Sequence, residues 1–444
     1  MPLDFLYVLR HATSMLRRAA IVGAAALTAC ASSEPKGYVT VTLAGSALGA
    51  EGTVVTTQAA RFEQLNPGVH VVIQRTPDDA SQRHQLFVQW LNAHVGQPDI
   101  LQIDVVWTPE FAAAGWILPL TRWHPDVSDL FPGVVAGDRW AGTLYALPWW
   151  TDIGMLYWRT DLLQHAPTSM HAMADALRRA HAVGTPRDGL VWQGARYEGL
   201  VTVFVEFLGA FGGAIMDDSG RVVVDAPQSI AALTFMRDLL RDGLVPRDAM
   251  TWHEEESRFA FQNGDALLMR NWPYAYALMS DTSASKIAGH FAAAPMPGGP
   301  GGSPTATLGG QQLAINALSP HPDAAYRLIA YLTAPAQMLE RARIAGTLPP
   351  RKSLYDQPAL DSALPMGVAV ARAVLEHATP RPVTPIYSQL SDLLQVQLHR
   401  ALTGQAEPSR ALHDAAAQMN ALVDRTHVRE LAHGRDSAAA AASR

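Results

Sequence analysis

Aromatic side chains stand close to carboxylates or amides in three short segments of the chain. The segments are residues 104–107 (DVVW), 149–152 (WWTD) and 271–274 (NWPY). Indole and phenol rings stack on the apolar C–H faces of a pyranose, and carboxylates make charge-assisted bonds to its hydroxyl groups. The segments therefore suit a saccharide ligand. The alternative is that tryptophans such as Trp107, Trp116 and Trp149 are ordinary core residues.

Sequence motifs of the common enzyme classes are absent. The chain has no HExxH, GxSxG, Walker A or GxGxxG pattern, and its 16 histidines lack metal-ligand spacing. Glu254, Glu255 and Glu256 are adjacent, and neighbouring helical residues point about 100° apart, so they cannot flank one glycosidic bond. We interpret them as a solvated helix start, where acids are favoured. We expect no catalytic residue, no metal and no cofactor.

The composition predicts large folded cores and excludes a nucleic-acid surface. Of 444 residues, 48% are hydrophobic, and the length suggests two or three domains. The formal charge is −6, from 34 Lys and Arg against 40 Asp and Glu, and no basic stretch is interleaved with aromatic residues. Phosphate backbones need a positive surface, so we expect no nucleic acid as a partner.

The N-terminal segment is typical of a lipoprotein leader. Residues 19–29 (AAIVGAAALTA) form a short apolar run after Arg17 and Arg18, and no later stretch is apolar for long enough to span a membrane. The run ends in LTAC, which resembles a lipobox with Cys30 as the acylated residue. We expect a signal peptide at 1–29, with Met15 as an alternative start, and an acylated tether at 30–37. The protein would then be extracytoplasmic and held to the membrane through its lipid anchor only.

Strand and helix patterns alternate in the first part of the chain. Residues 38–43, 69–73 and 99–103 have strand patterns, and residues 53–65 and 82–93 between them have helical spacing. Successive strands separated by helices predict a parallel α/β topology.

A second block of alternating elements begins after residue 148. It has a strand pattern at 155–158 and several helical patterns between 170 and 262. Residues 295–304 (PMPGGPGGSP) are a loop by composition, and residues 432–444 are expected to form a flexible tail.

Six segments in a fixed order link these features to a known family. They are PDILQIDVVW (98–107), LYALPWWTDIGMLYWRTDLL (144–163), FAFQNGDALLMRNWPYAY (259–276), TLGGQQLAI (307–315), GTLPPRKSLY (346–355) and ATPRPVTPIYSQLS (378–391). Through them, residues 38–402 resemble the extracytoplasmic solute-binding proteins of ABC sugar importers, most closely the trehalose/maltose-binding branch. Each segment alone is weakly specific, whereas their joint order is specific.

The resemblance implies an α/β fold of two lobes, the type II-like periplasmic-binding-protein fold, with a ligand cleft between the lobes. Lobe 1 would comprise 38–147 plus 296–345, and lobe 2 would comprise 148–295 plus 346–431. The chain would cross between the lobes near 147–148, around 287–295 and near 346–350.

The resemblance also implies ten ligand contacts, which comprise hydroxyl acceptors, donors, stacking rings and loop bonds. They are Glu51, Asp104 and Asp152 as acceptors, Arg83 and Arg381 as donors, Trp150 and Trp272 as stacking rings, Tyr274 as a hydroxyl partner, and Gly310 and Gln311 as sources of backbone and side-chain bonds. Two positions depart from the family pattern. Gln311 stands where relatives have Trp or another side chain, and Trp150 stands where Tyr is frequent, so sugar binding is better defined than the choice of disaccharide.

The function implied is capture of a disaccharide, trehalose first and maltose second, by a monomer without enzymatic activity. The partners would be the transmembrane subunits of an ABC permease with its cytoplasmic ATPase. Alternatives that the residues leave open are another sugar or a longer α-glucan, a sensory role, a secreted glycosidase, and a structural lipoprotein without a ligand.

Overall fold

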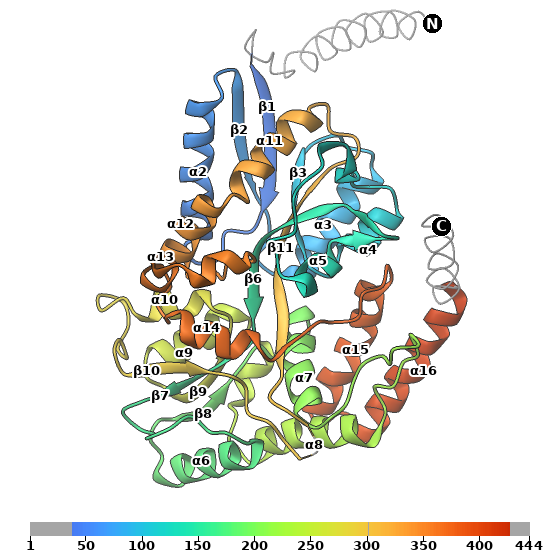
Figure 1. Cartoon of the computed structure of the whole chain (residues 1–444). Helices are drawn as coiled ribbons and strands as arrows, with labels where there is room; N and C mark the ends of the chain where they lie inside the picture. Colours follow the sequence, from blue (N-terminus) through green and yellow to red (C-terminus); the bar gives the residue numbers. More distant parts are fainter. Residues whose placement is uncertain (1–37, 301, 427–444) are drawn as a thin grey trace, which may run out of the picture.

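The computed structural model describes residues 38–300 and 302–426 (Figure 1). The expected signal peptide at 1–29, the lipidation site Cys30, the tether at 30–37 and the tail at 432–444 lie outside these residues and stay predictions. Within the described ranges, no helix is long and apolar enough to cross a membrane.

The first sheet contains the expected parallel strands of lobe 1. Strands β1 (Val39–Gly45), β2 (Val69–Arg75) and β3 (Ile100–Asp104) run parallel, with β1 between the other two. The sheet continues from β3 through β11 (Ala306–Ile315) to β12 (Ala378–Thr379), and β6 (Ala146–Ile153) also pairs with β11. Both β3 and β6 are antiparallel to β11, so the parallel prediction holds for the first three strands and not for the whole sheet.

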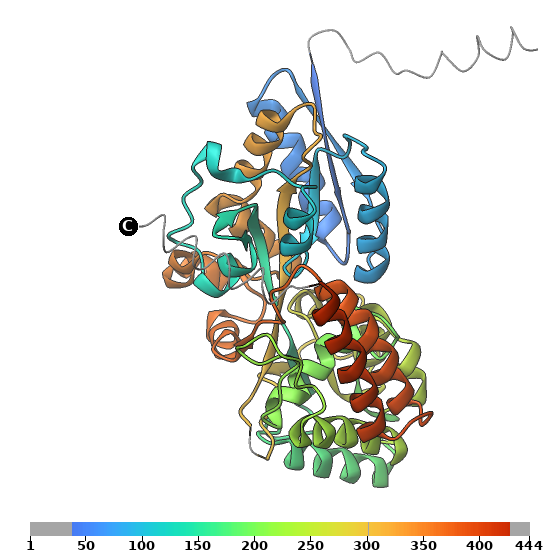
Figure 2. The ribbon, with the colours of Figure 1, turned by 90° about the vertical axis from the view of Figure 1, so that its right-hand side faces the viewer.

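The second sheet forms the base of lobe 2 and is mixed. Its order is β10 (Phe291–Ala294), β7 (Met155–Arg159), β9 (Ala266–Asn271) and β8 (Asp188–Val191). Only β8 and β9 are parallel. Figure 2 shows the two lobes one above the other, joined where the strands pass between them.

Helices cover both sheets. Those of lobe 1 are α2 (Glu51–Leu65), α3 (Ala80–Asn92), α4 (Thr108–Ala113), α5 (Pro132–Gly137), α11 (Pro322–Leu332) and α12 (Pro335–Ala345). Those of lobe 2 are α6 (Met170–Val183), α7 (Glu198–Ala210), α8 (Pro227–Arg241), α9 (Glu254–Gln262), α10 (Tyr274–Met279), α15 (Tyr387–Leu402) and α16 (Pro408–Thr426). Two further helices, α13 (Pro358–Ala363) and α14 (Val368–Leu375), lie between α12 and β12 in the chain.

Helix α7 is the centre of the lobe 2 core. Every residue from Glu198 to Leu208 is buried, which fits a mostly apolar helix that is surrounded by other elements. Helices α8 and α15 pack against it, and α16 packs against α15 (Figure 2). This packing holds the first turn of α7, which begins at Glu198, toward lobe 1, where Ser81 Oγ accepts a bond from the Glu198 backbone N–H at 3.2 Å.

Three segments connect the lobes, and one of them differs from the prediction. Strand β6 leads from the first sheet into β7, and residues 346–350 lie beside it, with Thr151 N donating to Leu348 O at 2.9 Å. The crossing expected around 287–295 is wrong, because these residues include β10 of the second sheet. The chain crosses later, with β11. The Pro- and Gly-rich residues before β11 have no hydrophobic pattern that assigns them to a lobe.

Candidate ligand-binding site

A cavity of about 80 Å³ lies between the two lobes. A buried water needs about 10–15 Å³, so the cavity has room for several water molecules. Its wall contains all ten residues expected from the sequence: Glu51, Arg83, Asp104, Trp150, Asp152, Trp272, Tyr274, Gly310, Gln311 and Arg381. The structure therefore brings the candidate residues together, although they come from segments far apart in the chain.

Lobe 1 contributes side chains from two helix starts and one strand end. Glu51 is the first residue of α2 and is 6% exposed, and Arg83 lies in the first turn of α3. Asp104 is the last residue of β3, at the carboxyl edge of the parallel strands where open α/β sheets bind ligands. Arg83 donates through Nη1 to the carbonyl oxygens of Pro77 and Asp78, which orients the guanidinium.

The connecting strands contribute Trp150 and Asp152. Both lie in strand β6, two residues apart and hence on one face. Trp150 Nε1 donates to Asp152 Oδ2 at 2.9 Å, which fixes the indole and the carboxyl relative to each other. Gly310 of β11 allows the close approach: its φ is +123°, and a Cβ atom there would lie 2.4 Å from Trp150 O.

Lobe 2 contributes Trp272 and Tyr274, which follow strand β9. Trp272 Nε1 lies 3.4 Å from Glu254 Oε1, and the Tyr274 hydroxyl donates to Glu255 Oε1 at 2.7 Å. The Tyr274 oxygen can still accept a bond from a ligand hydroxyl.

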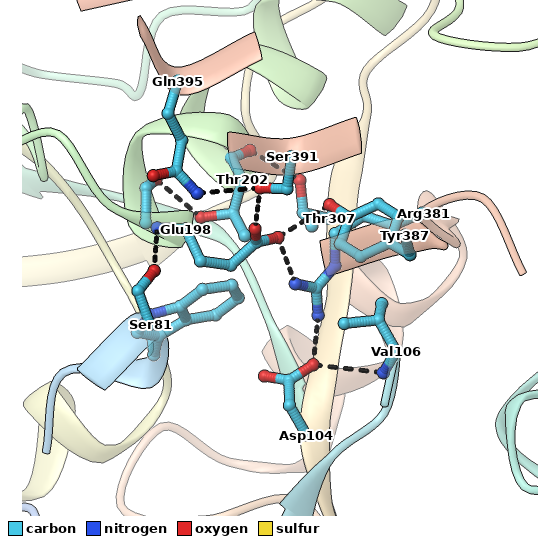
Figure 3. A network of polar contacts seen from close by, with 12 residues as sticks. Ser81, Asp104, Val106, Glu198, Thr202, Thr307, Arg381, Tyr387, Ser391 and Gln395 are labelled. Atoms are coloured by element: carbon cyan, nitrogen blue, oxygen red, sulfur yellow. Dashed lines mark hydrogen bonds and ion pairs between the residues drawn. The ribbon is translucent and has the colours of Figure 1, made fainter. Parts of the chain in front are cut away.

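Arg381 links the two lobes through an ionic network (Figure 3). Its Nη2 donates to Asp104 Oδ1 of lobe 1 at 2.8 Å, and its Nη1 donates to Glu198 Oε1 of lobe 2 at 2.6 Å. Tyr387 donates to the same Glu198 oxygen at 2.7 Å, and Ser391 donates to the other. Two carboxylates thus already bind the guanidinium, and its expected bond to a ligand hydroxyl stays a prediction.

Glu198 and Glu254 also line the cavity, and sequence reasoning did not single them out as ligand contacts. Each is the first residue of a helix, α7 and α9 respectively. The interpretation of residues 254–256 as a solvated helix start is correct for the helix and wrong for Glu254. Lobe 1 covers this end of α9, where Asp79 Oδ2 lies 3.1 Å from His253 Nε2. The sequence signal available for both residues was an acidic side chain at the start of a helix. That signal does not show which part of the chain faces the helix start.

Burial shifts the acid–base properties of the cavity. It raises the pKa of Glu51 to about 8, with further raising by the nearby Asp152 and lowering by Arg341 and Arg83. Burial also raises the pKa of Asp152 to about 7, although the bond from Trp150 lowers it. The pKa of Glu254 is raised by burial as well. The cavity therefore holds carboxyl groups that are poised to ionise when donors reach them.

A second cavity in the described part of the chain is larger and chemically different. It has a volume of about 540 Å³ and lies in lobe 2 between α7, residues 213–220 and residues 379–384. Its wall is mostly apolar and contains no aromatic ring that could stack on a sugar, and its polar side chains are those of Asp217, Asp218, Ser219, Thr379, Arg381 and Thr384. It therefore suits a sugar less well than the interlobe cavity. Among residues 38–300 and 302–426, no cluster of three or more His, Cys, Asp or Glu side chains could hold a metal ion.

Comparison with known protein families shows to which family the chain belongs. The pattern of the bacterial extracellular solute-binding proteins matches residues 47–339, which is more than half of the 444 residues. The chain belongs to this family. Members are solute-binding proteins and not enzymes, and they act outside the cytoplasm, so this solute-binding protein is extracytoplasmic.

Two curated relatives are similar over most of the chain. A probable ABC transporter-binding protein of Deinococcus radiodurans is 34% identical over 420 residues, which cover 91% of this chain and 98% of the relative. A mannitol-binding protein of Pseudomonas aeruginosa is 28% identical over 358 residues, which cover 73% of this chain and 80% of the relative.

Solved structures agree with the fold. Maltose-bound MalE3 of T. maritima has a TM-score of 0.82 and 39% identity, and the match covers 86% of this chain and 99% of that one. The GacH receptor of Streptomyces glaucescens GLA.O, solved without ligand and with acarbose, has a TM-score of 0.79 and 26% identity, with coverage of 87% and 98%. The predicted two-lobed α/β fold of the solute-binding proteins is confirmed.

Proposed function

We propose that this solute-binding protein is the sugar receptor of an ABC importer and captures a disaccharide at the interlobe cavity, which widens when the lobes move apart. The observation that carries the proposal is the cavity wall, in which Trp150 and Trp272 stand among the carboxyls of Glu51, Asp104 and Asp152. Aromatic faces bind the C–H surface of a sugar ring, and buried carboxylates bind its hydroxyls.

The mechanism is a shift between open and closed arrangements. A ligand that contacts both lobes stabilises the closed arrangement, which the transmembrane subunits of the permease would recognise, while the cytoplasmic ATPase drives transport. No covalent bond changes. A wrong stereoisomer would leave buried hydroxyl partners unpaired, at a cost of about 1–3 kcal/mol each.

Two disaccharides are the proposed ligands. The sequence resemblance favours trehalose first and maltose second, and the maltose-bound MalE3 structure, at 39% identity, supports maltose. Gln311 makes one wall of the cavity polar, and its Oε1 has no hydrogen-bond partner among the described residues. A ligand hydroxyl could donate to this oxygen.

Calorimetric titration of the purified protein tests the proposal. Trehalose, maltose, glucose and mannitol are titrated separately, and each sample is then checked for hydrolysis. Saturable binding of trehalose or maltose, with the sugar intact, supports the receptor. If neither disaccharide gives a binding signal, the proposed ligand is wrong. Release of glucose would favour a glycosidase.

The expected lipid anchor is tested separately by Cys30→Ser. This change removes the thiol that would be acylated, so the variant should be lost from the membrane fraction or remain unprocessed while sugar affinity is unchanged. Fractionation with a blot, and titration of the same preparation, measure both properties. Retention of processed variant in membranes contradicts the anchor.

A further inference from the structure

Two tryptophans of the cavity wall each contact a buried guanidinium. Arg270 Cζ lies 3.9 Å from the ring centroid of Trp272, and Arg341 Cζ lies 4.7 Å from that of Trp150 and 4.0 Å from that of Trp149. Arg270 and Arg341 are 0% and 1% exposed, and neither lines the cavity. Each guanidinium therefore contacts its indole from the protein side.

The two arginines differ in their other partners. Arg270 donates from Nε to Glu206 Oε2 at 2.9 Å and from Nη1 to Gln193 Oε1 at 3.0 Å, so an ion pair holds it. None of the three guanidinium nitrogens of Arg341 has a hydrogen-bond partner among residues 38–300 and 302–426. A buried cation without such partners is costly, so the indole faces and nearby charges must stabilise it.

The nearby charge is Glu51 of the cavity wall. Helix α12, which carries Arg341, packs on α2, which carries Glu51, and Gln58 Nε2 donates to Glu340 Oε2 at 3.1 Å between these helices. Burial lowers the pKa of Arg341 to about 10, and Glu51 raises it. The charged groups that act on Glu51 are Asp152 from β6, Arg341 from α12, and Arg83 and Asp78 from α3 and the loop before it.

We propose that Arg341 is a positioning residue of the ligand site: it holds the Trp150 ring as a wall of the cavity and supplies positive charge behind Glu51. The inference rests on the proposed function, because Trp150 and Glu51 are sugar contacts only in that function. Arg341 itself touches no ligand. Its planar guanidinium packs against the Trp150 ring, and its positive charge favours the ionised form of Glu51.

Two variants distinguish the role of the planar guanidinium of Arg341 from the role of its positive charge. Arg341→Met removes both, and Arg341→Lys keeps the charge without the planar group. The control is Arg343→Met, which removes an exposed arginine of the same helix. Sugar affinity is measured by calorimetry across pH. In the ligand-free proteins, NMR follows the Glu51 carboxyl, assigned with Glu51→Gln, and the Trp150 indole, assigned with Trp150→Phe.

Arg341→Met is expected to weaken trehalose or maltose binding about tenfold or more and to raise the apparent pKa of Glu51. The pH below which binding weakens then moves upward. Arg341→Lys should keep the Glu51 titration of the wild type but shift the Trp150 resonance and weaken binding by a smaller factor.

Two results would overturn the proposal. One is an Arg341→Met protein whose Glu51 titration, Trp150 resonance and affinity match those of Arg343→Met. If Arg341→Met does not fold, an Arg341→Lys protein with wild-type Trp150 resonance and affinity overturns the role in holding the ring. If the wild type binds no disaccharide, the proposed function fails, whereas the ligand-free titration still decides the role of Arg341.

Discussion

At the scale of single residues, the buried carboxyls predict how sugar binding depends on pH. The pKa of Glu51 is raised to about 8 and that of Asp152 to about 7, both mainly by burial. Sugar hydroxyls donate to the ionised carboxylates, so binding must release protons wherever these groups are still protonated. Affinity should rise between about pH 6 and 8 and level off above.

Calorimetry in buffers of different ionisation enthalpy measures the released protons directly. The control is Asp152→Asn, which cannot ionise and should bind more weakly with a shallower pH dependence. Affinity that falls steadily from pH 6 to 8, or binding without proton release, contradicts this account.

A second prediction at this scale concerns Glu254, which the structure places in the cavity wall. Glu254→Gln keeps the shape of the side chain and removes the charge, so a charge-assisted bond worth about 1.5–3 kcal/mol becomes a weaker neutral one. Sugar affinity should fall about tenfold. The matched control is Glu256→Gln, two residues further in α9, where Gln can still accept the capping bond from His253 N. Equal affinities of the two variants, measured by titration, would remove Glu254 from the site.

At the scale of elements, the pairing of β6 with β11 places Trp150 and Asp152. Gly310 sits opposite Thr151 in this pairing, with a φ of +123°. Gly310→Ala would bring Cβ against Trp150 O, so strain and overlap add, and the free energy of unfolding should fall by roughly 3 kcal/mol or more. Chemical denaturation measures the loss.

Gly404→Ala is the control for backbone strain alone. Gly404 also has a positive φ, of +78°, but nothing lies within 4 Å of the position that a Cβ atom would take there. Its substitution should cost about 1 kcal/mol. If the two variants lose equal stability, close packing of β6 against Gly310 is not what requires the glycine.

At the scale of the whole molecule, Arg381 controls how the lobes meet. It bonds Asp104 of lobe 1 and Glu198 of lobe 2, so Arg381→Met leaves two buried carboxylates without their cation. We expect sugar affinity to fall at least tenfold and the ligand-free protein to become more open, with a larger radius of gyration in small-angle scattering. Arg372→Met, which removes a half-exposed arginine paired with an exposed aspartate, is the control. Scattering and affinity equal to those of the control contradict this role.

Much of the site could be predicted because the resemblance to the family implies its ten residues. Asp104 ends a strand, Glu51 opens a helix, and Trp272 stands in a recognisable segment, so residue type and local position agree. The strand character of residues 149–152 was missed, because β6 exists through pairing with β11, which lies more than a hundred residues later.

The sequence by itself determined the family, the alternation of strands and helices in lobe 1, and the residue types that line the cavity. These depend on periodicity and on short motifs. Only the tertiary structure decided that Arg381 lies between two carboxylates, one of them 277 positions away, and that the Arg341 guanidinium contacts the Trp150 ring. It also decided that Glu254 faces the cavity and that β11 is the crossing strand. The physical reason is that burial, ion pairing and ring stacking depend on which distant segments meet, and no local pattern specifies their distance.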